Sequence, residues 1–425
     1  MKHWISLLLA LALLIGGLAA AERRHAQAPV SAQSLLYLVA DSERDLTRLP
    51  AHFTRIADAQ EISLGNTLAK QVLDGRKKLT ADDQEIEADI ARIGARIAPQ
   101  AQRRLPFRFH YLPDRSLVNA FALPGGHVFV GAGLLEEMTT EDELASVLAH
   151  EVEHIDHYHC AERLQVEAAL RKIPLGAVLQ IPVAVFQAGY SKEQELEADR
   201  EGVLLAARAG YSAAGALRLF AMFEKLEREA PPRTPQEEAA RVTYDVLTGY
   251  FRSHPPMQER IAQVRAMIVR QPELAVRAER PLAVEPIIVG WKSLDAVTER
   301  KFALAAELAT RALQLRPGYP AAMQALCEAD YGLGRDAAAA DVYRQLVARD
   351  TTAADAAEKW GEERAEELAN AKEYGREIAL VESLLTVQPA QPRLLQLAAW
   401  AYAMKGDDAA AAAKAMTITR LYMST

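Results

Sequence analysis

Two histidines, His150 and His154, lie four residues apart, and Glu151 directly follows the first of them. Residues four apart lie on one face of an α-helix, a single turn from each other, so both imidazoles can reach one metal ion. Glu151 then lies within reach of a water molecule at that ion and could accept its proton. Since this pattern also arises by chance, it predicts a metal-dependent hydrolase only where the surrounding residues form a helix.

The residues around the motif predict that helix. Thr140 is followed three residues later by Glu143, which is the pattern of a capping box at a helix start. Apolar residues then recur at helical spacing through the motif, at Leu144, Val147, Leu148, Val152 and Ile155. We therefore expect both histidines in the middle of one helix.

A second helix, from residue 191 to about 209, could complete a metal site. It opens with a capping box at Ser191 and ends before Gly210. Asp199 falls on its apolar face, with Glu195 one turn earlier, and a core-facing carboxylate should be paired or bound to metal. Glu195 is the candidate third zinc ligand, and Asp199 is the candidate acceptor for a ligand histidine's second N–H. The alternative is a solvated acidic face, which the upstream histidines make the weaker interpretation.

The histidine motif, the Glu195 and Asp199 pair and the segment 119–130 together resemble the M48 family of zinc metallopeptidases. The segment reads Asn-Ala-Phe-Ala-Leu-Pro-Gly-Gly-His-Val-Phe-Val, and the resemblance covers roughly residues 55–270. The family includes members with several membrane-spanning helices, which this sequence does not predict. The chain is therefore similar to the exported branch of the family.

The resemblance also implies roles for individual residues. In that family the two histidines and the first acidic residue of the later motif bind zinc, and the glutamate after the first histidine is the general base. It thus implies one zinc ion per chain, bound by His150, His154 and Glu195, with Glu151 as catalytic base.

Ser253-His254-Pro255-Pro256 is similar to a segment of the exported branch in which the histidine approaches the zinc. The resemblance implies that His254 either blocks the metal as a fourth ligand or assists catalysis as a transition-state donor. The alternative is a surface histidine ahead of a helix that the prolines open at Met257.

Three further histidines could lie near the site. If the motif helix continues, His157 lies about 10 Å farther along it than His150, too far to share the ion, and His159 points away from the metal, so both are expected to be structural. His127, on a predicted strand, could line the cleft or be structural.

Strand patterns occur ahead of the motif helix, at residues 105–112, 119–123 and 127–130. We expect a small antiparallel sheet, to whose edge a peptide could add as one more strand; alternatively, the strands only cover the helices. Helical spacing dominates elsewhere, with a break between two helices at residues 74–76. The predicted fold class is α+β, mainly α: a zincin-like metallopeptidase domain followed by an α-helical tetratricopeptide-like solenoid.

The C-terminal part contains a repeat. Pro317 and Pro389 are 72 residues apart, as are Gly334 and Gly406, which is twice a period close to the ~34-residue tetratricopeptide unit. Such an array forms a concave groove suited to peptides or partner proteins, whereas the alternative is a plain helical bundle.

Residues 1–21 contain a basic residue near their start, Lys2, continue with an uncharged apolar run and end in small residues, as a cleaved secretory signal peptide does. We therefore expect the periplasm, with an uncleaved anchor as the alternative. The expected segments are a signal peptide 1–21, a lead-in 22–54, a metallopeptidase domain 55–271, a linker 272–293 and a repeat domain 294–425.

The net charge of -8 argues against nucleic acid as a partner and against electrostatic docking on anionic lipid. The uncharged, proline-containing segment 173–190 could be core, a lid over the site or a peripheral membrane contact. Cys160 and Cys327 could form a disulfide, although two buried free thiols are the favoured interpretation.

The function expected from these features is an exported zinc metalloendopeptidase acting on misfolded or unassembled envelope proteins. Its repeat domain would recruit substrates or partners, including outer-membrane proteins or their assembly machinery, as the resemblance implies. A chaperone or adaptor with a latent or structural zinc site is the alternative, and a zinc hydrolase of other substrates is a weaker third. An intact Glu151 favours the enzyme, because a closed structural site needs no general base.

Overall fold

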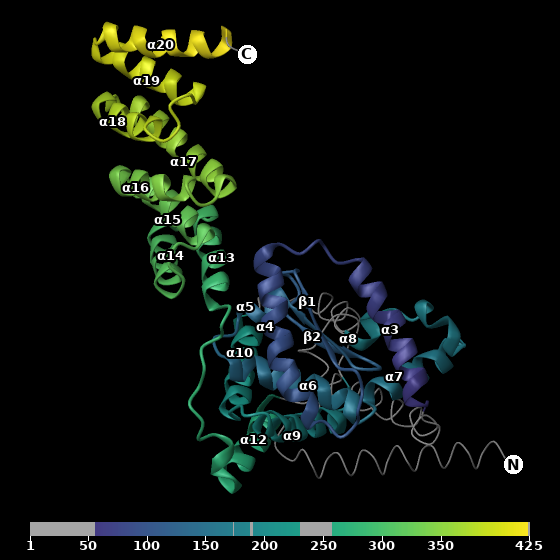
Figure 1. Ribbon diagram of the computed structural model, residues 1–425. Helices are drawn as coiled ribbons and strands as arrows, with labels where there is room; N and C mark the ends of the chain where they lie inside the picture. The colour runs from purple at the N-terminus through teal and green to yellow at the C-terminus, as the bar shows by residue number, and fades with distance from the viewer. Residues whose placement is uncertain (1–55, 173, 188–189, 230–256, 424–425) are drawn as a thin grey trace, which may run out of the picture.

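The computed structural model describes four stretches of the chain, residues 56–172, 174–187, 190–229 and 257–423. In them a three-stranded sheet lies among the helices of the N-terminal half, and a stack of helices extends away from it toward the C-terminus (Figure 1). The expected signal peptide and lead-in, together with His254, lie outside the described residues.

The first two helices are α3 (Asp58–Asp74) and α4 (Ala81–Ile97), separated at Gly75 as the sequence predicts. The side chain of Thr80 accepts a hydrogen bond from the backbone N–H of Asp83, in a capping box that starts α4. Four isoleucines at helical spacing are fully buried and attach α4 to the sheet: Ile86, Ile90, Ile93 and Ile97. A short 3-10 turn, η1 (Ala98–Gln100), follows.

The sheet consists of β1 (Arg108–Leu112), β2 (Ala120–Leu123) and β3 (His127–Gly131), in the order β1-β3-β2. β2 and β3 form an antiparallel hairpin whose turn contains Gly125 and Gly126, both with positive φ. β1 pairs with β3 in parallel, so the sheet is mixed and the expected antiparallel sheet is wrong. The chain reverses direction twice between β1 and β3, which restores the direction of β1, and alternation in sequence does not reveal which strands become neighbours.

The sheet is covered on both faces. Val128 and Val130 of β3 belong to the core that contains α4 and the motif helix α6 (Glu141–Asp156). Phe129 belongs to the opposite core, with residues of α3 and of α7 (His159–Leu170). Because both faces of β3 are buried, this strand is apolar along most of its length.

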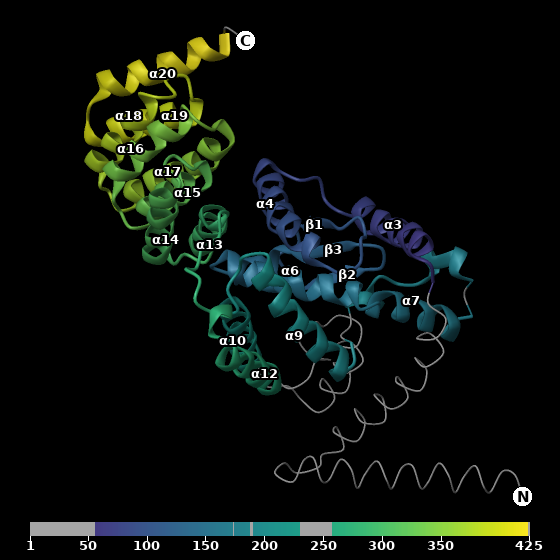
Figure 2. The same cartoon turned by 60° about the horizontal axis from the view of Figure 1, so that its bottom comes forward.

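Helix α6 is the centre of this half of the molecule. All its residues are buried, and it packs against α4, α9 (Lys192–Arg208) and α10 (Ala214–Glu229). Short helices precede and follow it in the chain: α5 (Ala132–Glu136), η2 (Leu175–Gln180) and α8 (Ala184–Gln187). Helix α12 (Met257–Arg270) packs on α9 and α10 (Figure 2).

Residues 272–293, which the sequence predicts to be a linker, are partly helical in the structure. They contain η3 (Pro272–Leu274), and α13 begins at Glu285. Between these helices the backbone N–H of Leu282 donates to the carbonyl of Thr139, and that of Glu141 donates to the carbonyl of Arg280. This segment therefore packs against the start of α6, and its many charged side chains conceal that contact in the sequence.

The C-terminal half is a stack of helices in which neighbours along the chain pack on each other (Figures 1 and 2). They are α13 (Glu285–Thr298), α14 (Phe302–Leu315), α15 (Pro320–Gly332), α16 (Asp336–Val347), α17 (Thr351–Asn370), α18 (Tyr374–Leu385), α19 (Pro392–Lys405) and α20 (Asp408–Met423). The stack contacts the N-terminal half at the start of α4, where the Tyr319 hydroxyl donates to Asp82 at 2.6 Å. Its tetratricopeptide character stays a prediction.

The structure also bears on two smaller expectations. Cys160 and Cys327 are both buried and free, so they do not form a disulfide. Within the segment 174–190, Ile181 and Phe186 are buried in the core that includes α3 and α7. Across the described stretches, the helices lack the combination of length and apolarity that crossing a bilayer requires.

Candidate metal centre

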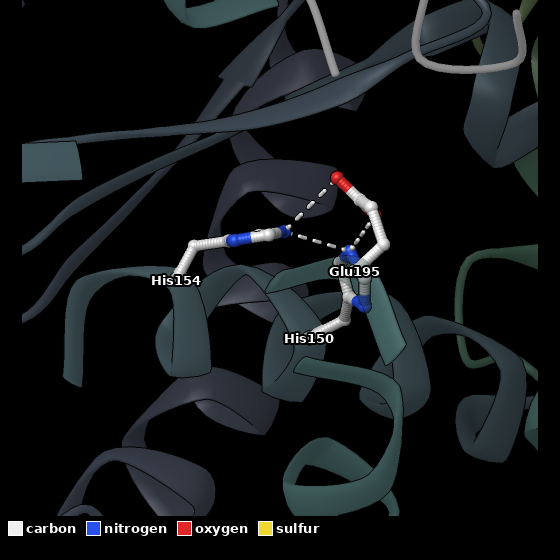
Figure 3. A group of neighbouring side chains, drawn as sticks. All are labelled: His150, His154 and Glu195. Carbon is white, nitrogen blue, oxygen red and sulfur yellow. Dashed lines mark hydrogen bonds and ion pairs between the residues drawn. The ribbon is translucent and has the colours of Figure 1, made fainter. Parts of the chain in front are cut away.

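Three buried side chains meet between α6 and α9. The Nε2 atoms of His150 and His154 lie 3.0 Å apart, and the carboxylate of Glu195 lies 3.4 Å from the first and 3.7 Å from the second (Figure 3). The relative exposures are 3% for His150, 1% for His154 and 0% for Glu195. The structure thus brings together the three predicted zinc ligands, which form a group of metal-binding type among the described residues.

The chemistry of this group fits a divalent cation. Nδ1 of His150 lies 3.0 Å from the Asp199 carboxylate, so that nitrogen keeps its proton when the ring is neutral, and Nε2 then presents a lone pair. With the proton of His154 likewise on its Nδ1, two nitrogen lone pairs and a carboxylate converge on one buried space. Such a set of acceptors needs a cation at its centre. Two imidazoles and one carboxylate are a common zinc ligand set and leave a coordination position open.

A buried ion pair supports His150 from behind. Arg260, on α12, donates from Nε and from Nη2 to the two carboxylate oxygens of Asp199, both at 2.6 Å. Burial alone would raise the pKa of Asp199, but Arg260 and His150 offset it and hold that pKa below its usual value. Asp199 thus occupies the place that the sequence predicts, as an ionised acceptor next to a ligand histidine.

Arg260 is a residue that the sequence analysis missed. It is 1% exposed, and its guanidinium lies over the ring of Phe220. Arg260 precedes the buried Val264 by four residues, so the apolar spacing of α12 places an arginine on the core-facing side. An arginine at such a position needs a buried carboxylate, and that signal could have connected it to Asp199.

His159 lies beside the site, so the expectation that it points away is wrong. Its Nδ1 lies 3.0 Å from Nδ1 of His154, and its Nε2 lies 3.3 Å from Glu197. Helix α6 ends at Asp156 and Tyr158 adopts a left-handed conformation with φ 62°, so α7 begins at His159 in a new direction. The expectation for His159 assumed one straight helix through residue 159, and the turn at Tyr158 directs this side chain differently.

Two other histidines have structural contacts. His157 lies 3.2 Å from Glu153 and 3.6 Å from Glu197, as expected for a residue outside the ligand set. His127 is buried, with its Nδ1 3.0 Å from His110 Nε2 and its Nε2 2.9 Å from Asn66 Oδ1. These partners occupy both ring nitrogens of His127 and indicate a structural role rather than one in the cleft.

Glu151 is buried next to the ligands. Its burial raises its pKa to about 7; nearby Glu195 acts in the same direction, while His150 opposes it. A hydrogen bond from the Ala122 backbone also reaches this carboxyl group, which places it against strand β2. A carboxyl group with a pKa close to neutral is suited to accept and return a proton.

The pKa of His150 is also raised, but by neighbouring carboxylates and against the effect of burial. Burial would lower its pKa, but the carboxylates of Asp199 and Glu195 outweigh burial and raise the pKa to about 10. The ring therefore carries a second proton at neutral pH until a cation displaces it. Metal binding at this group is consequently a competition with a proton.

The segment that follows α7 reaches the site at Tyr190. The ring of Tyr190 stacks on that of His154 with centroids 4.0 Å apart, and its hydroxyl lies 3.2 Å from Cys160 Sγ. α8 packs on the edge strand β2, and Cys160 Sγ donates to the carbonyl of Ala122. A peptide that paired with β2 at Ala122 would therefore have to replace contacts that the chain itself makes.

Comparison with known proteins is consistent with this geometry. Residues 84–268 match Peptidase family M48. The β-barrel assembly-enhancing protease of Yersinia pestis is 30% identical over 174 residues, which is 36% of this chain and 35% of that protein. The mitochondrial metalloendopeptidase OMA1 of Arabidopsis thaliana is 31% identical over 165 residues, which is 36% of this chain and 31% of that protein.

A longer match links the chain to a Vibrio cholerae protein, which is 27% identical over 260 residues, or 56% of this chain and 50% of that protein. The chain thus spans half or less of the length of these curated relatives. The matched region contains the ligand group, Glu151, Asp199 and Arg260. Residues 84–268 therefore form a Peptidase M48 family domain.

Proposed function

We propose that the chain is an exported zinc metalloendopeptidase that hydrolyses peptide bonds in misfolded or unassembled envelope proteins. The observation that carries the hydrolytic part is the convergence of His150, His154 and Glu195 on one buried space beside Glu151. The name of the Yersinia pestis relative refers to β-barrel assembly, which supports the substrate class. The apolar pattern of residues 1–21 supports export to the periplasm.

The site residues have two roles: three of them bind the metal, and Glu151 transfers a proton. His150, His154 and Glu195 hold the metal, and Asp199 fixes the ring of His150. Zinc bound there would supply Lewis acidity, which lowers the pKa of water and polarises a carbonyl group. Glu151 accepts the proton of the attacking water and returns it to the leaving amine, a role that its raised pKa supports.

The helical stack would recruit the substrate or a partner. It extends from α13 to α20, beyond the half of the molecule that holds the ligands (Figure 1). Stacked helix pairs present extended surfaces for peptides or folded partners. We propose that outer-membrane proteins, or the machinery that assembles them, bind this part of the chain.

The decisive experiment replaces Glu151 with Gln in the mature full-length chain. The variant should keep zinc, measured as metal content, but cleave an unfolded casein-type substrate about 10²- to 10⁴-fold more slowly. Glu193→Gln, at an exposed position of α9, is the matched control and should cleave as the wild type does. Equal cleavage by the Glu151→Gln variant would refute hydrolysis through this residue, whereas absence of cleavage by the zinc-loaded wild type would favour a chaperone with a structural zinc site.

His254 requires a separate variant. If His254 blocks the metal, His254→Ala should increase turnover at unchanged zinc content. If it assists catalysis, the same change should decrease kcat while the Michaelis constant changes little. A variant with unaltered zinc content and unaltered kinetics would show that His254 does neither.

A further inference from the structure

The ring of His154 is constrained on three sides. Its Nε2 faces His150 and Glu195, its Nδ1 lies 3.0 Å from Nδ1 of His159, and its face stacks on Tyr190. His154 is 1% exposed and His159 is 4% exposed, so water does not compete freely for these positions. The contact with His159 is therefore part of the environment that holds the ligand.

The protons on this chain of contacts can be assigned from the metal outward. If Nε2 of His154 binds a cation, its Nδ1 must carry the proton and donate to Nδ1 of His159. His159 then accepts at Nδ1 and carries its own proton on Nε2, which lies 3.3 Å from Glu197 Oε2. One set of tautomers thus satisfies all three groups, and it is the set that leaves Nε2 of His154 available for metal.

The backbone places these residues from two directions. The left-handed residue Tyr158 turns the chain between α6 and α7, so His159 becomes the first residue of α7 and faces back toward α6. The guanidinium of Arg103 lies over the Tyr158 ring at 3.8 Å from its centroid. Glu197 comes from α9, two residues after the ligand Glu195, so one turn of α9 supplies both a ligand and the end of this chain of contacts.

The two ligand histidines are consequently supported in different ways. Behind His150, Asp199 and Arg260 form a pair whose side chains are 2% and 1% exposed. Behind His154, the contacts lead through His159 to Glu197, whose side chain is 38% exposed and also lies 3.6 Å from His157 and 3.8 Å from Arg200. The Asp199–Arg260 pair behind His150 is thus enclosed in the core, whereas the contacts behind His154 lead from the metal centre to a partly exposed carboxylate.

We infer that His159 and Glu197 are positioning residues for the ligand His154, in which Glu197 orients His159 and His159 fixes the tautomer and ring orientation of His154. The inference rests on the proposed metal site. Partners of this kind raise the basicity of a ligand histidine, and their loss typically weakens metal binding about 10- to 100-fold. A mere packing role would affect folding stability and leave the metal affinity unchanged.

The experiment measures the zinc dissociation constant of the mature chain by competition with a chelator. His159→Leu removes the acceptor and should weaken binding by about 10- to 100-fold. His159→Asn can place its side-chain oxygen where Nδ1 lies and should restore most of the affinity. Glu197→Ala should weaken binding by a smaller factor, whereas Glu193→Ala, exposed on the same helix, should bind as the wild type does.

A spectroscopic readout separates positioning from packing. The visible absorption bands of the cobalt-substituted protein should shift or lose intensity in His159→Leu and return in His159→Asn. If His159→Leu does not fold, His159→Asn and Glu197→Ala decide the matter by their affinities and spectra. Unchanged zinc affinity and an unchanged spectrum in a folded His159→Leu variant would overturn the inference. If His159→Leu does not fold, unchanged zinc affinity and an unchanged spectrum in Glu197→Ala would overturn it.

The outcome is distinguishable from a failure of the proposed function. If the wild-type chain binds no zinc, the metal site itself is refuted. If the wild type binds zinc and loses cleavage on Glu151→Gln, while the His159 and Glu197 variants bind zinc as the wild type does, only the positioning role is refuted.

Discussion

Gly202 on α9 lies directly against the backbone of His150 on α6. A Cβ atom at Gly202 would be 3.1 Å from the backbone nitrogen of His150 and 3.2 Å from its Cα. Glu195, Asp199 and Gly202 follow one another at intervals of four and three residues, so they share one face of α9. The missing side chain at Gly202 therefore allows the close helix contact that carries both carboxylates to the histidines.

Gly202→Ala should separate the two helices by a few tenths of an ångström and weaken zinc binding about tenfold. The neighbouring atoms belong to backbone, which yields less readily than the end of a side chain. Overpacking should cost about 1–3 kcal/mol, more than the gain of about 1 kcal/mol from replacing a helical glycine with alanine. Zinc affinity and denaturant unfolding measure both effects.

Gly375→Ala on α18 is the control for that substitution. Within 4 Å, an added Cβ there would meet only the Lys405 amino group, at 3.7 Å. This variant should therefore be as stable as the wild type or slightly more stable. If Gly202→Ala behaved in the same way, the close contact between α6 and α9 would not matter for the site.

The buried pair of Asp199 and Arg260 should behave as one unit. Arg260→Met leaves a buried carboxylate without its cation, and Asp199→Asn leaves a buried guanidinium without its anion, each at a cost of about 3–5 kcal/mol. The double variant removes both charges and should cost clearly less than the sum of the single changes. Urea unfolding of the four proteins tests this, and additive losses would show that the two residues act independently.

The sequence predicted those parts of the site that depend on local spacing. The capping boxes at Thr140 and Ser191 start α6 and α9 as expected, because each depends on residues three apart. Helical periodicity then placed His150, His154 and Glu195 on faces that could meet. The meeting itself was inferred from the chemistry of the three side chains and from resemblance to a family.

The features that the sequence did not predict depend on tertiary contacts. The mixed sheet arises because β3 inserts between β1 and β2, which strand alternation does not encode. The position of His159 depends on one left-handed residue, Tyr158, which is not of a type that usually adopts this conformation. Arg260 reaches Asp199 from a helix 61 residues away in the chain.

Cleavage should depend on the protonation state of Glu151. Burial raises its pKa to about 7, and below its pKa the carboxyl group is protonated and cannot accept a proton from water. A bound divalent cation adds positive charge and lowers this pKa, so the acid limb should lie at or below that pH. We expect kcat/KM to fall about tenfold per pH unit along that limb.

That profile can be measured with a peptide substrate that has no titratable side chains. Zinc content must be recorded at each pH, because protons also compete for His150. A rate that stays constant down to about pH 5 at full zinc content would exclude Glu151 as a base with a raised pKa.

The histidine pair in the sheet should make the fold sensitive to acid. Burial lowers the pKa of His110 and of His127 from 6.5 to about 4. Both rings are therefore neutral in the fold above that pH, whereas the unfolded chain binds protons from about pH 6.5 downward. Their contribution is fully present above about pH 6.5 and is lost as the pH falls toward 4, by roughly 2–3 kcal/mol for each ring.

Unfolding free energies at about pH 7 and about pH 5 measure this loss. His127→Gln retains a donor toward Asn66 and removes a titrating ring, so its stability should change less between the two pH values. An equally steep loss of stability in His127→Gln would assign the acid sensitivity to other groups.

The contact between the helical stack and the metallopeptidase half should depend on Tyr319. Its ring is 4% exposed and packs against Gly290, and its hydroxyl donates to Asp82 at 2.6 Å. Arg316 lies 3.0 Å from Glu85 nearby, but both side chains are more than 40% exposed, so that ion pair contributes little. Tyr319→Ala should therefore cost about 3 kcal/mol and Arg316→Ala less than about 0.5 kcal/mol.

Hydrogen exchange can show which parts of the fold are destabilised in Tyr319→Ala. In Tyr319→Ala, the hydrogen-bonded amides of Gln84 and Met323, at the starts of α4 and α15, should exchange faster, because the contact between these helices opens first. Amides at Glu141 and Leu282 should keep their protection, since their hydrogen bonds to Arg280 and Thr139 attach the intervening segment to α6 independently of Tyr319. Loss of protection at Glu141 as well would instead show that displacement of the stack is transmitted to the start of the metal-binding helix.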